Sequence, residues 1–111
     1  MIRRNKFNAK KTVVDGLTFD SKREAAYYAE LKLRERAGEI SKLRCHECFP
    51  LIGFEGVKIC LFKPDFNYFD IHEDRYRVVD VKSPPTAKKA DFRLKKKLFE
   101  AQYGVELEIV F

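Results

Sequence analysis

The feature that most constrains the fold is the run VVDVK at residues 78–82, an apolar stretch that ends in two charges. Residues two apart on a β-strand point to the same face, so Asp80 and Lys82 project together while the neighbouring valines point away. A carboxylate and an ammonium at the end of a buried strand are costly unless they pair or bind something. We therefore expect a strand over 76–82 whose charged end is either an ion pair or part of a site.

The composition predicts one folded domain, residues 1–111, with a polyanionic partner. The hydrophobic fraction is 45%, which suits a small core and argues against disorder. The net charge of +6 favours nucleic acid or an anionic membrane surface. No apolar run reaches the roughly 20 residues of a membrane span, and no apolar signal segment follows the N-terminus. We therefore expect a cytoplasmic protein that does not enter a membrane, with its three cysteines reduced.

Residues 1–12 are expected to form a basic, flexible arm, either a solvated tail or a contact to phosphates. The cations considered for phosphate contact are Arg3, Arg4, Lys10 and Lys11. The following residues, 13–19, predict a small hairpin around Asp15-Gly16.

Residues 21–37 predict the clearest helix, with Asp20 or Ser21 as its cap and Gly38 after its last turn. Its apolar face comprises Ala25, Tyr27, Tyr28 and Leu31. Glu24 shares this face and has two explanations. It can complete a capping box with Ser21, or its carboxylate can belong to a site.

Residues 40–52 predict an extended segment interrupted by Pro50, with a Cys-x-x-Cys pair at Cys45 and Cys48. One such pair is only half of a structural zinc site, which usually needs two more ligands. Candidates for these are Cys60, His46 and His72. We expect buried thiols and keep a zinc-stabilised interaction domain as a less favoured alternative.

A second predicted strand segment, 57–70, contains Pro64, which cannot donate to a ladder and marks an edge, bend or bulge. A polar turn near His72 joins this segment to the strand over 76–82, which predicts an antiparallel pair. Counting back from that turn places Asp65 beside Asp80.

Residues 87–103 predict a second helix with Leu94, Leu98 and Ala101 on its core face, followed by a strand over 105–111. The helix is very basic, with only Asp91 and Glu100 to balance its cations. Such a run is often a solvated face, but next to the suspected site we favour phosphate contact. These cations are Lys88, Lys89, Arg93, Lys95, Lys96 and Lys97.

The charged groups predicted to converge are Glu24, Asp65, Asp80 and Lys82. Adjacent carboxylates repel unless a cation intervenes, and Mg²⁺ commonly takes one or two carboxylates. Asp65 and Asp80 are thus a plausible magnesium pair, and Lys82 could orient a water or stabilise phosphorane charge. Taken alone, however, Asp-x-Lys on a strand favours an ion pair without catalysis.

Pro64-Asp65 followed by Asp80-Val81-Lys82 resembles the PD-(D/E)xK motif of the restriction-endonuclease-like nuclease superfamily, and Glu24 on a preceding helix matches its first acidic position. The order of predicted elements is similar to its αβββαβ core. The chain also resembles a family of small phage and prophage proteins known only as a domain of unknown function. The similar stretches are residues 5–11, 14–25, 63–66, 79–82 and 92–99.

The resemblance implies an α/β restriction-endonuclease-like fold, with a central mixed sheet flanked by helices. It implies a magnesium-dependent DNA endonuclease, with Mn²⁺ as a substitute ion. Asp65 and Asp80 would be metal ligands, the Val81 carbonyl a possible third and Glu24 a further ligand, directly or through water. Lys82 would be the catalytic lysine. His46 stands where we expect a glutamine and receives no role.

The implied setting is phage replication, recombination or packaging in the cytoplasm of a bacterial host. Branched DNA such as a Holliday junction is one candidate substrate, and the resemblance allows for a homodimer. The residues expected to bind nucleic acid are Arg3, Arg4, Lys10, Lys11, Lys88, Lys89, Arg93, Lys96 and Lys97. The alternative from another class is a non-catalytic nucleic-acid-binding module whose charged cluster is only structural.

Overall fold

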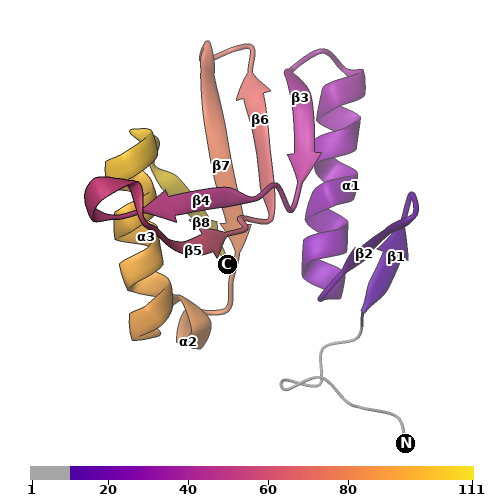
Figure 1. The fold of residues 1–111 in the computed structure, drawn as a ribbon. Coiled ribbons are helices and arrows are strands. Elements are labelled where there is room, and N and C mark those ends of the chain that lie inside the picture. Colours follow the sequence, from indigo (N-terminus) through magenta and orange to yellow (C-terminus); the bar gives the residue numbers. More distant parts are fainter. Residues whose placement is uncertain (1–10) are drawn as a thin grey trace, which may run out of the picture.

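The computed structural model describes residues 11–111, and a mixed four-stranded sheet lies at their centre (Figure 1). The strands are β3 (Ile40–Cys45), β6 (Phe66–Asp70), β7 (Arg75–Val81) and β8 (Leu107–Val110). Their order is β3-β6-β7-β8. The β3–β6 and β6–β7 pairs are antiparallel, whereas β7 and β8 are parallel. The predicted α/β class with a mixed sheet is therefore confirmed.

Two helices cover the sheet, α1 (Lys22–Arg36) and α3 (Ala90–Tyr103). The period-two alternation of β7 separates two apolar cores. Val79 packs into the cluster that contains Tyr28 and Leu31 of α1, while Val78 packs into the cluster that contains Phe92 and Phe99 of α3. Strand β7 is thus buried on both faces, which explains its run of valines.

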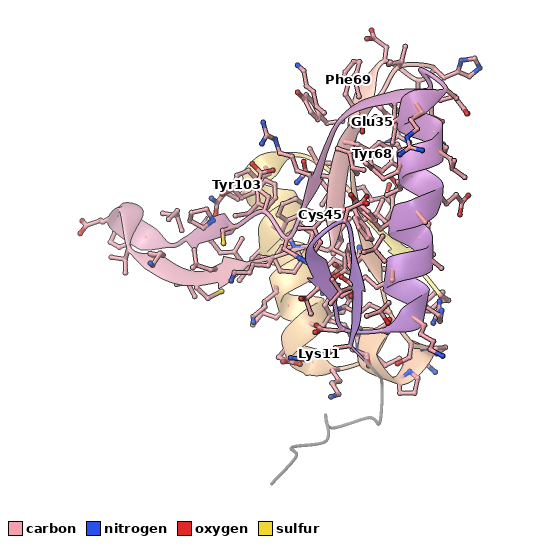
Figure 2. The ribbon with its side chains drawn as sticks, turned by 90° about the vertical axis from the view of Figure 1, so that its right-hand side faces the viewer. Lys11, Glu35, Cys45, Tyr68, Phe69 and Tyr103 are labelled. Atoms are coloured by element: carbon pink, nitrogen blue, oxygen red, sulfur yellow. The ribbon has the colours of Figure 1, made fainter. Side chains whose placement is uncertain are left out.

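Two short ribbons complete the domain. Strands β1 (Thr12–Val14) and β2 (Leu17–Phe19) form the predicted hairpin, which lies next to α1. Strands β4 (Phe49–Ile52) and β5 (Lys58–Phe62) form a second ribbon with the one-turn helix η1 (Phe54–Gly56) at its tip. Figures 1 and 2 show this β4–β5 ribbon extending sideways from the sheet past α3.

The β4–β5 ribbon changes two details of the predicted strands. The extended segment over 40–52 is interrupted at 46–48, and Pro50 lies inside β4 opposite Leu61. Proline is tolerated there because β4 pairs with β5 alone among the described strands. The segment 57–70 is likewise two strands in two sheets. Pro64 marks the place where the chain leaves the ribbon and enters the central sheet.

The C-terminal helix also differs from the expectation. Pro84 begins a separate short helix, α2 (Pro84–Ala87), because proline suits the first helical positions. Helix α3 then starts at Ala90 rather than at residue 87. The predicted core residues Leu94 and Ala101 are exposed. Leu98 packs half-buried against the core as expected, and Phe92 and Phe99, seven residues apart, are the buried residues of this face.

Within residues 11–111, no helix is long and apolar enough to span a membrane. The expected basic arm over 1–12 falls largely outside the described residues, as do Arg3, Arg4 and Lys10. Thr12 already belongs to β1, so its inclusion in the arm was wrong.

Candidate active site

Asp65 and Asp80 lie next to each other at the ends of β6 and β7, as predicted. The register pairs Phe66 with Val79, which places the residue before β6 beside Asp80. The amide of Asp65 donates to Oδ1 of Asp80 at 2.7 Å. In turn, Oδ2 of Asp65 accepts from the amide of Val81 at 2.7 Å. Each carboxylate therefore holds the backbone of the opposite strand.

The electrostatics of this pair are unfavourable for two negative charges. Burial, followed by the charges of Asp80 and Glu24, raises the pKa of Asp65 to about 8. Burial also raises the pKa of Asp80, although the charge of Lys82 and hydrogen bonds from Asp65 oppose that rise. A protonated Asp65 can share its proton with Asp80. The positive charge around the pair is therefore too small to keep both carboxylates ionised.

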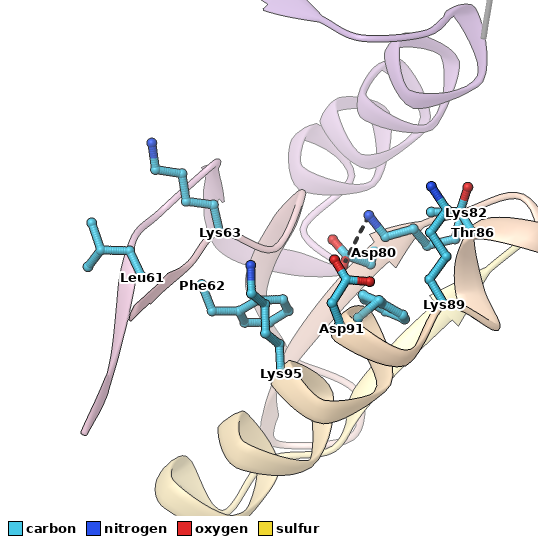
Figure 3. Close-up of a pocket in the computed structure, with 10 residues that line it drawn as sticks. Leu61, Phe62, Lys63, Asp80, Lys82, Thr86, Lys89, Asp91 and Lys95 are labelled. Carbon is cyan, nitrogen blue, oxygen red and sulfur yellow. Dashed lines mark ion pairs between the residues drawn. The ribbon is translucent and has the colours of Figure 1, made fainter. Parts of the chain in front are cut away.

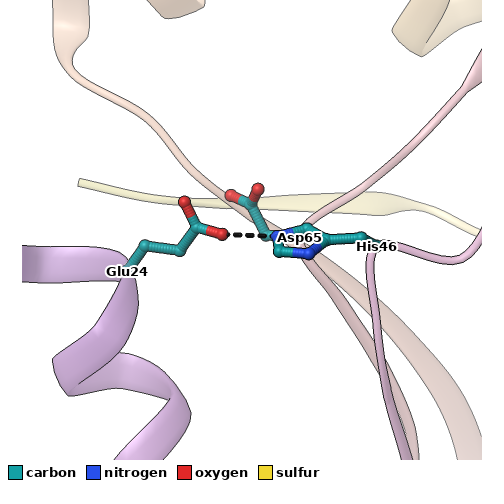
Figure 4. Close-up of side chains that lie close together, drawn as sticks. All are labelled: Glu24, His46 and Asp65. Carbon is teal, nitrogen blue, oxygen red and sulfur yellow. Dashed lines mark hydrogen bonds and ion pairs between the residues drawn. The ribbon is translucent and has the colours of Figure 1, made fainter. Parts of the chain in front are cut away.

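Glu24 points toward this pair from the first turn of α1. Its amide donates to Oγ of Ser21 at 3.1 Å, which is half of the expected capping box. Its carboxylate Oε1 lies 2.7 Å from Nε2 of His46, as Figure 4 shows. The residue is only 4% exposed. Ser21 therefore caps the helix by accepting from the Glu24 amide, which leaves the Glu24 carboxylate free to point into the site.

His46 is the site residue to which the sequence assigned no role. It follows β3 with a φ of 55°, a left-handed conformation that residues other than glycine rarely adopt. Its amide donates to the carbonyl of Asp65 at 3.1 Å, and its ring centroid lies 5.8 Å from that of Phe19. One potential ligand atom each from Glu24, His46 and Asp65 lies within 4.8 Å of the others (Figure 4).

Lys82 lies at the other end of the cluster. Its Nζ is 3.8 Å from Oδ2 of Asp80 and 5.0 Å from the ring centroid of Phe92. The ion pair considered from the sequence is therefore present, at a long distance. Asp80 is 1% exposed, so water screens its charge little. The nearby ammonium of Lys82 partly offsets that charge. The four predicted site residues are therefore successive neighbours: Glu24 lies near Asp65, Asp65 next to Asp80, and Asp80 next to Lys82.

Asp80 and Lys82 open onto a pocket of about 390 Å³ between α3 and the β4–β5 ribbon (Figure 3). Cations on separate segments surround it. Lys95 belongs to the basic helix for which we expected phosphate contact, whereas Lys63 had not been selected from the sequence. Its lysines are Lys63, Lys82, Lys89 and Lys95, against the acids Asp80 and Asp91. This charge balance suits an anionic ligand.

Within residues 11–111, the other predicted nucleic-acid-binding residues divide into three groups. Lys96 forms an ion pair with Glu100 at 3.0 Å. Arg93 and Lys97 border a different depression, next to Leu94 on the outer side of α3. Lys11 and Lys88 are exposed and do not line the pocket. The helix register therefore separates cations that are adjacent in the sequence.

The zinc alternative finds no support within residues 11–111. Cys48 is exposed, while Cys45 and Cys60 are half-buried. None of the three belongs to a group of three potential ligands there. Burial and the charge of Glu24 raise the pKa of the Cys45 thiol to about 11, which disfavours the thiolate that zinc requires.

Comparison with known proteins gives a family match that covers nearly the whole chain. The family model described as "Protein of unknown function (DUF1064)" matches residues 4–110. No curated protein and no solved structure matches the chain. What the site can do therefore follows from its own residues.

Proposed function

The chain belongs to this family of unknown function, DUF1064, and from its own residues we propose that it is a magnesium-dependent endonuclease that hydrolyses DNA. The observation that carries the proposal is the exchange of hydrogen bonds between Asp65 and the Asp80–Val81 backbone, with Lys82 two residues beyond Asp80. This arrangement fits a PD-(D/E)xK site. The order α1, β3, β6, β7, α3, β8 also supports a restriction-endonuclease-like core, with the β4–β5 ribbon as an insertion.

The residues of the site fit a hard divalent cation. Glu24 and Asp80 are buried carboxylates, and burial, followed by the charges of Asp80 and Glu24, raises the pKa of Asp65 to about 8. Oxygen-rich sets of this kind suit Mg²⁺ and also Mn²⁺. Asp65 and Asp80 would hold the ion, with the Val81 carbonyl and Glu24 as further ligands. The chemistry supplied by such an ion is neutralisation of phosphodiester charge and acidification of a water nucleophile.

The side chains around that set have separate roles in the proposed hydrolysis. Lys82 is held between Asp80 and the Phe92 ring, where its ammonium can orient the water or stabilise the extra negative charge of the phosphorane. His46 fixes the carboxylate of Glu24. The pocket lysines hold the phosphates on either side of the scissile bond. Branched DNA remains the substrate form that we propose to test first.

The test is cleavage of branched and linear DNA with Mg²⁺ or Mn²⁺ by the wild type and Asp80→Asn. The variant keeps an oxygen that can accept from the Asp65 amide, so we expect it to fold, to bind DNA and to lose cleavage at least a hundredfold. The matched control is Asp74→Asn, the same change in the exposed turn at the other end of β7. It should cut like the wild type.

Metal binding gives a second readout. Mg²⁺ should raise the melting temperature of the wild type and of Asp74→Asn. It should raise the melting temperature of Asp80→Asn much less. If the wild type binds DNA and cuts none of these substrates with either ion, the nuclease proposal fails. A non-catalytic nucleic-acid-binding module would then be the better description.

A further inference from the structure

The β4–β5 ribbon exposes an apolar face, which we call the ribbon face. It consists of Ile52, Phe54, Val57 and Ile59, whose exposed fractions run from 41% to 86%. The inner face of the same ribbon is buried, since Leu51 and Phe62 pack into the core beside Phe99. The period of two along β5 therefore presents apolar side chains on both sides. Several exposed apolar side chains gathered on one surface mark an interaction site.

The charges of the ribbon indicate which class of partner can bind this face. Residues 49–62 contain one acid, Glu55, and one base, Lys58, so the ribbon is neutral in a chain of net charge +6. A nucleic acid or an anionic membrane would select a basic surface. The neutral ribbon face is not such a basic surface, whereas the pocket lined by Lys63, Lys82 and Lys95 is one.

The two charges are arranged for pairing with a copy of themselves. Glu55 and Lys58 are both exposed at the ribbon tip, and neither forms an ion pair with another residue in 11–111. In a twofold interface, residue i of one copy meets residue j of the other, and the reverse contact follows by symmetry. Glu55 of each copy can then meet Lys58 of the other, around an apolar centre.

The free edge of the ribbon also favours contact with another chain. The outer edge of β4 bonds to Gln102 and Tyr103 of α3, whereas β5 pairs with β4 alone among the described strands. An open strand edge such as that of β5 readily pairs with another chain. We therefore propose that the ribbon face is the contact between two copies of this chain in a twofold dimer. The proposal does not depend on nuclease activity, because the ribbon face contains neither the proposed metal ligands nor Lys82.

The test is the molar mass in solution, measured by sedimentation equilibrium of the full chain from micromolar to submillimolar concentration. We expect a dimer for the wild type. Phe54→Glu should shift it to monomer, because it buries a charge at the centre of the contact. Phe54 is 86% exposed, so the fold should be retained, which circular dichroism checks. Leu33→Glu is the matched control, since Leu33 is a comparably exposed residue on α1, and it should remain dimeric.

A charge exchange tests the orientation of the contact. Glu55→Lys and Lys58→Glu should each weaken the dimer at least threefold, because each brings like charges together across the twofold axis. The double variant restores opposite charges and should regain most of the wild-type affinity. A wild type that stays monomeric throughout, or a dimer that Phe54→Glu leaves intact, overturns the proposal. Failure of the charge exchange alone would overturn the twofold orientation of the tips.

Discussion

The amide of Asp65 donates to the carboxylate of Asp80 across the ends of two antiparallel strands, at 2.7 Å. The reciprocal bond runs from the amide of Val81 to Oδ2 of Asp65, also at 2.7 Å. These bonds place two buried carboxylates side by side without a full complement of positive charge. The stability and chemistry of the site should both reflect that arrangement.

The first prediction concerns the pH dependence of stability in the absence of metal. The pKa of Asp65 is raised to about 8, against about 4 in an unfolded chain. Between these values the folded protein retains a proton that the unfolded chain has lost. The contribution of Asp65 to the free energy of unfolding is therefore fully present below about pH 4 and falls as pH rises toward about pH 8.

Asp65→Asn removes this titration while keeping an oxygen that can accept from the Val81 amide. Relative to the wild type, the variant should gain stability between about pH 5 and about pH 8. Thermal unfolding in a chelating buffer measures the difference at each pH. Asp74→Asn, in the exposed turn, should show no such gain. Parallel curves for the wild type and Asp65→Asn would contradict the prediction.

The second prediction concerns the hydrogen bond between His46 and Glu24. Loss of the imidazole leaves a carboxylate that is 4% exposed without its 2.7 Å partner. We expect His46→Asn to lower the free energy of unfolding by about 1–3 kcal/mol. Asparagine tolerates the left-handed backbone at this position and is too short to reach Glu24, so the change reports on the side-chain bond.

A double-mutant cycle with Glu24→Ala isolates this bond from other effects of either change. Urea unfolding of His46→Asn, Glu24→Ala and the double variant should give a coupling energy of about 1 kcal/mol or more. Additive effects would show that the two side chains do not stabilise each other. The same variants should lower metal affinity if Glu24 must be held toward the site.

The third prediction separates the cations of α3. Lys95 lines the pocket beside Asp80, whereas Lys97, two residues later, borders the outer depression. Lys95→Ala should weaken DNA binding uniformly across sequences and reduce the dependence of log K on log salt by about one. Lys97→Ala is the control on the same helix and should leave that slope unchanged. Equal effects would mean that DNA contacts both sides of α3.

Several features followed from local sequence patterns. The strand over VVDV, the cap at Ser21, the turn at residues 15–16 and the neighbouring positions of Asp65 and Asp80 were all confirmed, while Lys82 lies just after the strand. Each depends on a short-range rule, such as the period of a strand or the length of a turn. The core face of α3 was predicted only in part. Leu98 packs against the core as expected, but several sets of apolar residues share its spacing, and only packing selects Phe92 and Phe99 over Leu94 and Ala101.

By itself, the sequence determined that Asp80 and Lys82 lie on one face at the end of a buried strand and that Glu24 lies in the first turn of a capped helix. These relations are local, because they follow from backbone geometry over a few residues. Tertiary structure alone decided that His46 meets Glu24, that Lys63 and Lys95 line one pocket, and that the β4–β5 ribbon leaves the sheet. Those relations join segments far apart in the chain, so they depend on how the cores pack rather than on any local pattern.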